Sequence, residues 1–109
     1  MAESSDLELA FVTAPDAETA ARIGRALVEE RLAACVNVLP GVTSIYRWKG
    51  AVETEAEVML LVKSRADRGP ALDARVRELH PYEVPEVIRV GISGGSVPYL
   101  DWVRSEVAP

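Results

Sequence analysis

The stretch ACVNVLPGVTSIYRWKGAVETEAEVMLLVK, residues 34–63, has the pattern of a single long β-hairpin. Lys49 and Gly50 can form a two-residue turn, because glycine adopts a positive φ at low steric cost. The predicted arms, residues 34–48 and 51–63, are rich in the β-branched and aromatic residues that favour strands. Each arm has about 13 to 15 residues, against roughly 5 to 6 in a usual strand. The hairpin is therefore expected to extend beyond the core of a chain of 109 residues.

The second arm carries apolar residues on both of its faces. Val58, Leu60 and Val62 fall on one face, and Met59 and Leu61 fall on the other. A strand with one solvated face should instead alternate apolar and polar residues. The helices of one small domain can cover one sheet face, so we expect a second copy of the chain to cover the other. A monomeric hairpin of unusual length is the alternative.

The residues before the hairpin and within its first arm also predict local structure. Alternating apolar residues predict a strand at residues 7–13. Asp16 is a good N-cap for a helix that runs to about Arg31, whose charge would suit the helix C-terminus. Pro40 cannot donate a hydrogen bond to a neighbouring strand, so together with Gly41 it predicts an edge strand or a bulge.

After the hairpin, a second helix, a strand and a final helix are expected. Asp67 is expected to cap a helix that ends at His80, because the residue before a proline is disfavoured in the α region. Residues 86–92 have the composition of a strand. Ser96 is expected to cap a final helix at residues 98–107.

The order of these elements predicts an α+β fold. Strand, helix, strand, strand, helix and strand form the βαββαβ sandwich of the ferredoxin-like class, here with a long extended β-hairpin and a short C-terminal helix. A chain of 109 residues is expected to form one domain, residues 1–109. Residues 1–5 are expected to be a frayed tail.

Composition argues against several functional classes. A net charge of −5 with dispersed acidic residues argues against nucleic-acid binding, which needs a clustered basic face. No apolar run reaches the ~18 residues of a membrane span, and the polar N-terminus lacks the pattern of a signal peptide. The only cysteine, Cys35, cannot form an internal disulfide. These features predict a cytoplasmic protein that binds neither nucleic acid nor membrane.

The densest cluster of side chains suited to chemistry is the run HPYEVPE, residues 80–86. It places His80 near Glu83 and Glu86, and imidazole with carboxylate suits copper or another divalent cation. Cys35 is a candidate soft ligand for Cu(I). The alternatives are a His80 that stabilises the end of the preceding helix and a Cys35 that is a small buried apolar residue.

Large aromatic residues gather near the predicted hairpin tip and in the last helix. Such side chains are typical of interface cores, although they also form clusters inside one subunit. Because the tip lies beyond the expected core, we predict an interface between copies of the chain. Its predicted residues are Tyr46, Trp48, Met59, Leu61, Tyr99 and Trp102.

The remaining polar residues give no sign of catalysis. The sequence has no GxxxxGK[ST] loop, no GxGxxG turn, no CxxC, no HExxH and no GxSxG. A nucleophile–base pair would have to be Cys35 and His80, and nothing in the pattern brings them together. Glu53, Glu55 and Glu57 are expected to form a solvated strand face. We therefore expect a protein that is not an enzyme.

Several long motifs, in order along the chain, resemble the CutA family of divalent-cation tolerance proteins. They are TAPD at residues 13–16, LAACVNVLPGVTSIYRWKG and ETEAEVMLLVK within residues 32–63, HPYEVPE at residues 80–86 and YLDW at residues 99–102. The resemblance covers nearly the whole chain. It implies a ferredoxin-like homotrimer, cytoplasmic in bacteria, that serves in tolerance to copper and other divalent cations and binds copper.

The copper ligands implied by the resemblance match this chain only in part. In the family they are a cysteine in the first strand and two consecutive histidines, at positions that here are Val12, Leu79 and His80. Only His80 keeps a ligating side chain. A copper site at His80 would therefore need further ligands, which other subunits of a trimer could bring.

Two alternative functions are consistent with the same pattern. The trimeric PII signalling proteins resemble the CutA family in fold, and such a module would bind a small anionic effector in clefts between subunits. The arginines that could serve there are Arg47, Arg65, Arg68 and Arg89. A structural scaffold for a protein partner is the second alternative.

Overall fold

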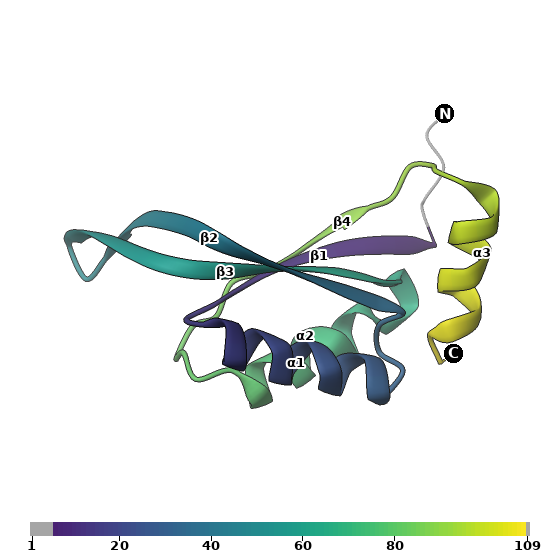
Figure 1. Cartoon of the computed structure of the whole chain (residues 1–109), viewed down its shortest axis with the longest axis horizontal. Coiled ribbons are helices and arrows are strands. Elements are labelled where there is room, and N and C mark those ends of the chain that lie inside the picture. Colours follow the sequence, from purple (N-terminus) through teal and green to yellow (C-terminus); the bar gives the residue numbers. More distant parts are fainter. Residues whose placement is uncertain (1–5, 109) are drawn as a thin grey trace.

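A four-stranded antiparallel sheet organises residues 6–108, which are those that this computed structural model describes (Figure 1). The strands are β1 (Leu7–Ala14), β2 (Cys35–Trp48), β3 (Ala51–Arg65) and β4 (Val87–Gly91). Their order across the sheet is β2-β3-β1-β4, so β2 and β4 form the two edges. The predicted tail, residues 1–5, lies outside the described residues.

Two helices cover one face of the sheet, and a third lies at one end (Figure 1). Helices α1 (Ala17–Glu29) and α2 (Gly69–Leu79) bury their apolar sides against the sheet, whereas α3 (Val97–Glu106) packs beside the start of β1. The fold is thus α+β, as predicted. Among the described residues no helix is long and apolar enough to cross a membrane. The main core includes Ala10, Val12, Ile23, Leu27, Leu60, Val62, Leu72 and Val76.

The predicted long hairpin is confirmed, with its turn and its irregularity at the predicted places. Strands β2 and β3 contain 14 and 15 residues. The turn between them holds Lys49 at a φ of 50° and Gly50 at a φ of 83°. The register shifts between Leu39 and Val42, where Gly41 has a φ of 81°. The hairpin therefore contains a bulge in an edge strand, and it extends well beyond the helices (Figure 1).

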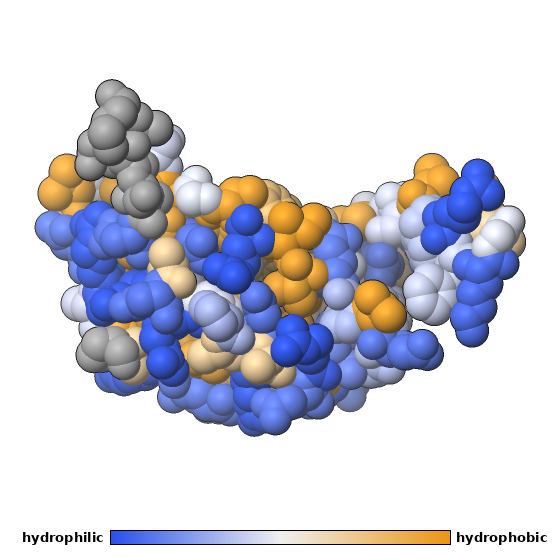
Figure 2. Space-filling view, turned by 180° about the vertical axis from the view of Figure 1, so that it is seen from behind, coloured by the Kyte–Doolittle hydropathy of each residue, from blue (hydrophilic) through white to orange (hydrophobic). Residues whose placement is uncertain are grey.

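The sheet face opposite α1 and α2 is apolar and largely uncovered. Strand pairing places Phe11 of β1 beside Leu61 of β3 and Ile88 of β4, so the three side chains share this face. Figure 2 shows apolar side chains along the concave upper side of the molecule, between its two raised ends. We call this surface the open face; it consists of Leu9, Phe11, Leu39, Met59, Leu61, Ile88 and Val90.

Three local predictions at helix ends are wrong. Helix α1 ends at Glu29, and Arg31 adopts a left-handed φ of 58° outside the helix. Asp67 does not cap α2: it lies in a 3-10 turn, and its two carboxylate oxygens accept hydrogen bonds from Arg65. Ser96 precedes α3, but its side chain makes no capping hydrogen bond. Helices α2 and α3 both have a proline in the first turn, which leaves fewer N–H groups for a cap to satisfy.

Helix α1 begins as predicted and packs closely on the sheet. Asp16 caps it, because Oδ1 accepts a 2.7 Å hydrogen bond from the backbone N–H of Thr19. About two turns further along the helix, Gly24 is buried against Val36 of β2, and a Cβ built on Gly24 would lie 3.0 Å from Val36 Cγ1. Glycine at this position therefore permits the close approach of α1 to β2.

Replacing Gly24 by valine should push α1 away from β2. We expect the free energy of unfolding to fall by about 2 kcal/mol, the usual cost of overpacking a tight contact. Ala21→Val is the matched control, because Ala21 is exposed on the same helix and the change should stay within about 0.5 kcal/mol. Urea denaturation measures both variants, and equal losses would contradict the packing explanation, because valine has a higher helix propensity than glycine.

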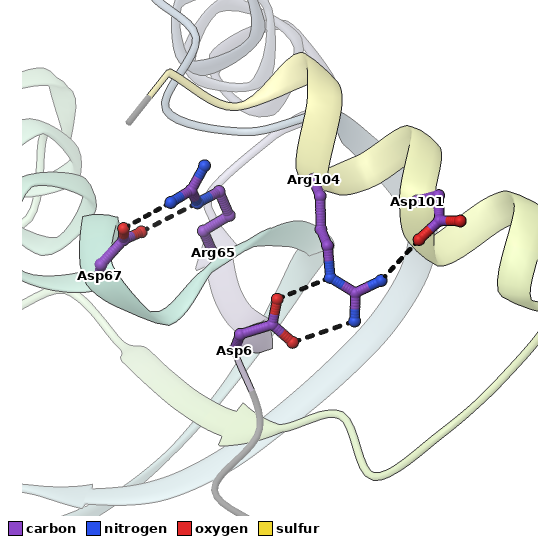
Figure 3. A network of polar contacts seen from close by, with 5 residues as sticks. All are labelled: Asp6, Arg65, Asp67, Asp101 and Arg104. Atoms are coloured by element: carbon purple, nitrogen blue, oxygen red, sulfur yellow. Dashed lines mark hydrogen bonds and ion pairs between the residues drawn. The ribbon is translucent and has the colours of Figure 1, made fainter.

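Charged side chains tie α3 to the beginning of β1 (Figure 3). The carboxylate of Asp6 accepts hydrogen bonds of 2.6 and 3.0 Å from Nε and Nη2 of Arg104. Arg104 also donates to Asp101 within α3, at 2.9 Å. The hydrogen bond from Arg104 is the main reason why the pKa of Asp6 lies below its ordinary value of 3.8.

This pair should make stability depend on pH in the acid range. Because the pKa of Asp6 is lower in the folded state, the pair stabilises the fold above pH 3.8, and its contribution is lost as the pH falls through the lowered value. Arg104→Met should therefore lower the urea midpoint slightly at neutral pH and have no effect in strong acid, since exposed ion pairs contribute little. A difference that persists unchanged in strong acid would contradict this.

Candidate functional site

His80 lies at the end of α2 with both ring nitrogens engaged. Its side chain is 7% exposed. Nε2 lies 2.7 Å from the carbonyl oxygen of Thr13, and Nδ1 lies 3.1 Å from the backbone nitrogen of Tyr82. A carbonyl only accepts and a backbone N–H only donates, so Nε2 carries the proton and Nδ1 accepts. The imidazole thus joins the end of β1 to the loop at residues 80–86.

The predicted metal ligands are not brought together in one chain. The hydrogen bonds of His80 leave no free lone pair on its ring for a metal ion. In the strand register, Cys35 of β2 lies opposite Lys63 of β3. Thr13 of β1, whose carbonyl accepts the hydrogen bond from His80, lies opposite Met59 of β3. Those β3 positions are four residues apart, or roughly 13 Å. Within residues 6–108 no group of three His, Cys, Asp or Glu side chains could hold a metal ion, so the residues present do not fit a metal centre.

Cys35 instead lies beside α3 and the inner end of β3. Its Sγ is 3.9 Å from Nζ of Lys63, which also donates a hydrogen bond to Asn37. Burial first, and then the thiol of Cys35, raise the pKa of Tyr99 in α3. The other predicted ligands, Glu83 and Glu86, are exposed on the loop. Cys35 is thus a half-buried residue at the base of the hairpin.

A cavity of about 620 Å³ lies between the outer half of the hairpin and the loop at residues 80–86. Its aromatic lining comes from Tyr46 and Trp48 of β2 and from Tyr82 of the loop. Two carboxylates, Glu57 of β3 and Glu86 of the loop, also line it. No basic side chain is among its lining residues.

Glu57 and Tyr82 are the site residues that sequence reasoning missed. Glu57 was expected on a solvated face with Glu53 and Glu55, but it is 8% exposed. Its Oε2 accepts a 2.8 Å hydrogen bond from the hydroxyl of Tyr82. Burial, followed by this hydrogen bond and the charge of Glu57, raises the pKa of Tyr82 strongly. Only the position of the loop distinguishes Glu57 from its neighbours, and that position is not visible in the strand pattern.

The predicted interface residues lie in three separate places. Tyr46 and Trp48 are near the hairpin tip, and Tyr99 and Trp102 are in α3 at the other end of the molecule (Figure 1). The rings of Tyr99 and Trp102 pack together with centroids 5.5 Å apart, which forms a local cluster. All four remain between 41% and 42% exposed. Met59 and Leu61 belong to the open face between these ends.

Two of the four arginines predicted for an anionic effector already form ion pairs with carboxylates. Arg65 binds Asp67, and Arg89 binds both Glu8 and Asp73. Among residues 6–108, neither Arg47 nor Arg68 forms an ion pair, and Nε of Arg68 is buried without a hydrogen-bond partner. These side chains do not converge on one cavity, so the structure offers an anion no prepared site within one chain.

Comparison with known proteins identifies close relatives. The divalent-cation tolerance protein CutA of Thermus thermophilus is 53% identical over 97 residues, which cover 89% of this chain and 94% of that protein. The human protein CutA is 53% identical over 95 residues, which cover 87% of this chain but only 53% of the human protein. The solved structure of the T. thermophilus protein superimposes with a TM-score of 0.91 at 50% identity, covering 94% of this chain and 99% of that one.

The name of the T. thermophilus relative specifies a role in divalent-cation tolerance, and neither name states a reaction. Some names also carry a compartment: a rice relative is called chloroplastic, and an Archaeoglobus fulgidus structure is called periplasmic. The family model described as CutA1 divalent ion tolerance protein matches residues 8–106. That match includes all the strands and helices of the fold except Leu7, the first residue of β1, and the chain therefore belongs to the CutA1 divalent ion tolerance family.

Proposed function

We propose that the protein acts in the cytoplasm as a homotrimer in the tolerance of divalent cations, and that it catalyses no reaction. Membership of the family supports the role. The strand order β2-β3-β1-β4 with α1 and α2 on one face supports the ferredoxin-like βαββαβ sandwich as its fold. The open face supports the assembly.

The open face is the observation that carries the proposal. It includes Leu39, Val90 and Ile88, which are 41%, 43% and 52% exposed in the single chain. Contiguous apolar patches on a protein surface mark interaction sites, because monomers seldom leave such area in water. Both edges of the sheet are also free to pair within the described residues, and β2 is a long edge of 14 residues.

The position of the exposed aromatic residues supports a closed ring of copies. The pair Tyr46 and Trp48 and the pair Tyr99 and Trp102 lie at opposite ends of the molecule (Figure 1). In a head-to-tail assembly, the aromatic pair at one end of each copy would contact the next copy. Contacts between unlike surfaces of identical copies generate a ring when the rotation closes, and a trimer is such a ring.

Copper binding stays a prediction. A metal ion could reach His80 only if the ring gave up its bond to Thr13 or to Tyr82, and Cys35 is too far away to assist. We propose that a cation, if bound, takes ligands from more than one subunit. The proposed role in tolerance does not require the protein itself to be the final ligand of the metal ion.

Native mass spectrometry with calorimetric titration tests the proposal. We expect an assembly of three chains of 11.8 kDa each at micromolar concentration. Titration of the reduced protein with Cu(I), Cu(II) and Zn(II) then shows whether a cation binds and with what stoichiometry per trimer. A stable, folded monomer would contradict the assembly, and an absence of binding for all three ions would remove direct binding from the proposal.

A further inference from the structure

We propose that the carboxylate of Glu57 in each copy pairs with the ammonium group of Lys63 in the next copy. The pair fixes the head-to-tail direction and the register of the ring. This inference deepens the proposed homotrimer and rests on it, because the site is incomplete until a second copy supplies the cation.

Glu57 is an almost buried carboxylate without a cationic partner in its own chain. The residue is 8% exposed, and its Oε2 accepts a 2.8 Å hydrogen bond from the hydroxyl of Tyr82. None of the ion pairs formed among residues 6–108 involves Glu57. A neutral hydroxyl does not replace the water that an ionised carboxylate loses on burial, so Glu57 favours the approach of a cation.

Lys63 offers a matching cation on the same strand. Its Nζ donates to Asn37 and lies 3.9 Å from Sγ of Cys35, so neither contact is a carboxylate. An ammonium group has three N–H donors, which leaves one for a further acceptor. Arg65, two residues along the same side of β3, is already paired with Asp67. Lys63 is therefore the cation on this side of β3 that can accept a carboxylate from another copy.

The two charged residues flank the open face along β3. Alternate residues of a strand share a face, so Glu57 and Lys63 point to the same side as Met59 and Leu61, which lie between them. Six residues of strand span roughly 20 Å, so the two charges cannot meet within one chain. The face thus has a negative end at the hairpin, an apolar middle and a positive end at the base of the hairpin.

This order of charges makes the face complementary to itself when copies are arranged head to tail. The outer hairpin of one copy, with Glu57, Tyr46 and Trp48, then meets the end of the next copy that carries Lys63 and α3 (Figure 1). The same contact brings the aromatic residues of the hairpin towards those of α3. An arrangement that placed Glu57 of one copy against Glu57 of another would bring like charges together, which opposes association.

The surroundings of Glu57 also favour a cation from outside the chain. Burial first, and then the carboxylates of Glu55, Glu57 and Glu53, raise the pKa of Tyr46. The negative charge that disfavours ionisation of this phenol attracts a cation. No basic side chain lines the cavity that contains Glu57 and Tyr46. The next copy is therefore the source of the cation.

Exchange of the two charges tests the pair. Each single variant, Glu57→Lys or Lys63→Glu, brings like charges together in every interface of the trimer. We expect both to dissociate at a urea concentration roughly 1 M or more below that of the wild type. The double variant Glu57→Lys/Lys63→Glu restores opposite charges and should recover at least half of the loss. Sedimentation velocity in a urea series, at one protein concentration, measures the dissociation.

Recovery in the double variant identifies a contact between copies, because the two positions are too far apart to interact within one chain. A double variant that is no more stable than the weaker single variant would overturn the pair. Glu55→Lys/Lys63→Glu is the matched control, because Glu55 is exposed two residues away on the same strand. If this control recovered as much as the double variant with Glu57→Lys, general attraction would explain the effect and the pair would be overturned.

Neutral variants keep the test decisive if an exchanged variant does not fold. Glu57→Gln keeps an oxygen for Tyr82, and Lys63→Gln keeps a donor for Asn37. An ion pair predicts that each replacement lowers the urea midpoint less than half as much when the other is already present. Additive losses would show that the two residues act independently, which contradicts the pair. Far-UV circular dichroism of each variant reports whether it is folded.

The wild type separates this inference from the proposed function. If the wild type is a monomer at micromolar concentration, the assembly and the pair fail together. If it is a trimer but neither cycle shows coupling, the pair alone fails and the assembly stands. If Glu57→Gln weakens the trimer whereas Lys63→Gln has no effect, Glu57 has a different partner and the pair is overturned.

Discussion

Replacing Leu61 by glutamate is expected to dissociate the assembly into folded monomers. In the single chain Leu61 lies partly exposed on the open face, between Phe11 and Asn37 of the neighbouring strands. A glutamate there is still in contact with water, so the monomer should lose no more than about 1 kcal/mol. In the trimer the same carboxylate would be buried without a partner in every copy, and each buried charge costs several kcal/mol.

Sedimentation velocity at micromolar concentration, together with far-UV circular dichroism, measures this outcome. Val28→Glu is the matched control, because Val28 is 41% exposed on α1, on the helix side of the sheet. We expect the control to sediment as the wild type does. If Leu61→Glu remained fully assembled and folded, the open face would not be the interface, and the proposed arrangement of copies would have to be abandoned.

Replacing His80 by alanine should produce the largest loss of stability among the loop variants. The change removes a buried ring and leaves the carbonyl of Thr13 and the N–H of Tyr82 without their partner. Each unsatisfied buried group costs about 1 to 3 kcal/mol, so the free energy of unfolding should fall by about 3 kcal/mol. The shape of the cavity should change as well, because Tyr82, which donates a hydrogen bond to Glu57, lies in the same loop as His80.

Urea denaturation of His80→Ala with and without a chelator distinguishes a structural role from a metal-binding one. A structural role predicts the same loss of stability in the presence of chelator and in the presence of copper. The protein concentration is kept fixed, because assembly also affects apparent stability. Glu83→Ala is the control: Glu83 is exposed three residues away, and its loss should change stability by less than about 0.5 kcal/mol. A loss for His80→Ala that appears only when copper is present would instead identify His80 as a metal ligand.

The local chemistry of single residues made most of the fold predictable. Lys49-Gly50 and Pro40-Gly41 restrict the backbone whatever surrounds them, so the turn and the bulge followed from the sequence. The helix ends were less predictable, because a capping side chain, a 3-10 turn or a proline can each satisfy or remove the free N–H groups of the first turn. At α2, a 3-10 turn and a proline replace the expected cap by Asp67.

The candidate site was only partly predictable. The sequence drew attention to His80, but it could not show that Thr13 and Tyr82 occupy both ring nitrogens. It also placed Glu57 in a solvated run, because alternation along a strand does not report which loop lies over it. The Tyr82–Glu57 hydrogen bond joins residues 25 positions apart, and only the folded chain brings them together.

The sequence alone determined the long hairpin, the order of the elements and the apolar character of both faces of β3. Those features depend on the φ preferences and polarity of residues that are close in sequence, and these are the same whatever the rest of the chain does. The tertiary structure decided that both ring nitrogens of His80 are hydrogen-bonded, and that rings and carboxylates from β2, β3 and the loop at residues 80–86 line one open cavity. The reason is physical: strand register and loop position set distances between residues that are remote in sequence, and local preferences leave those distances free.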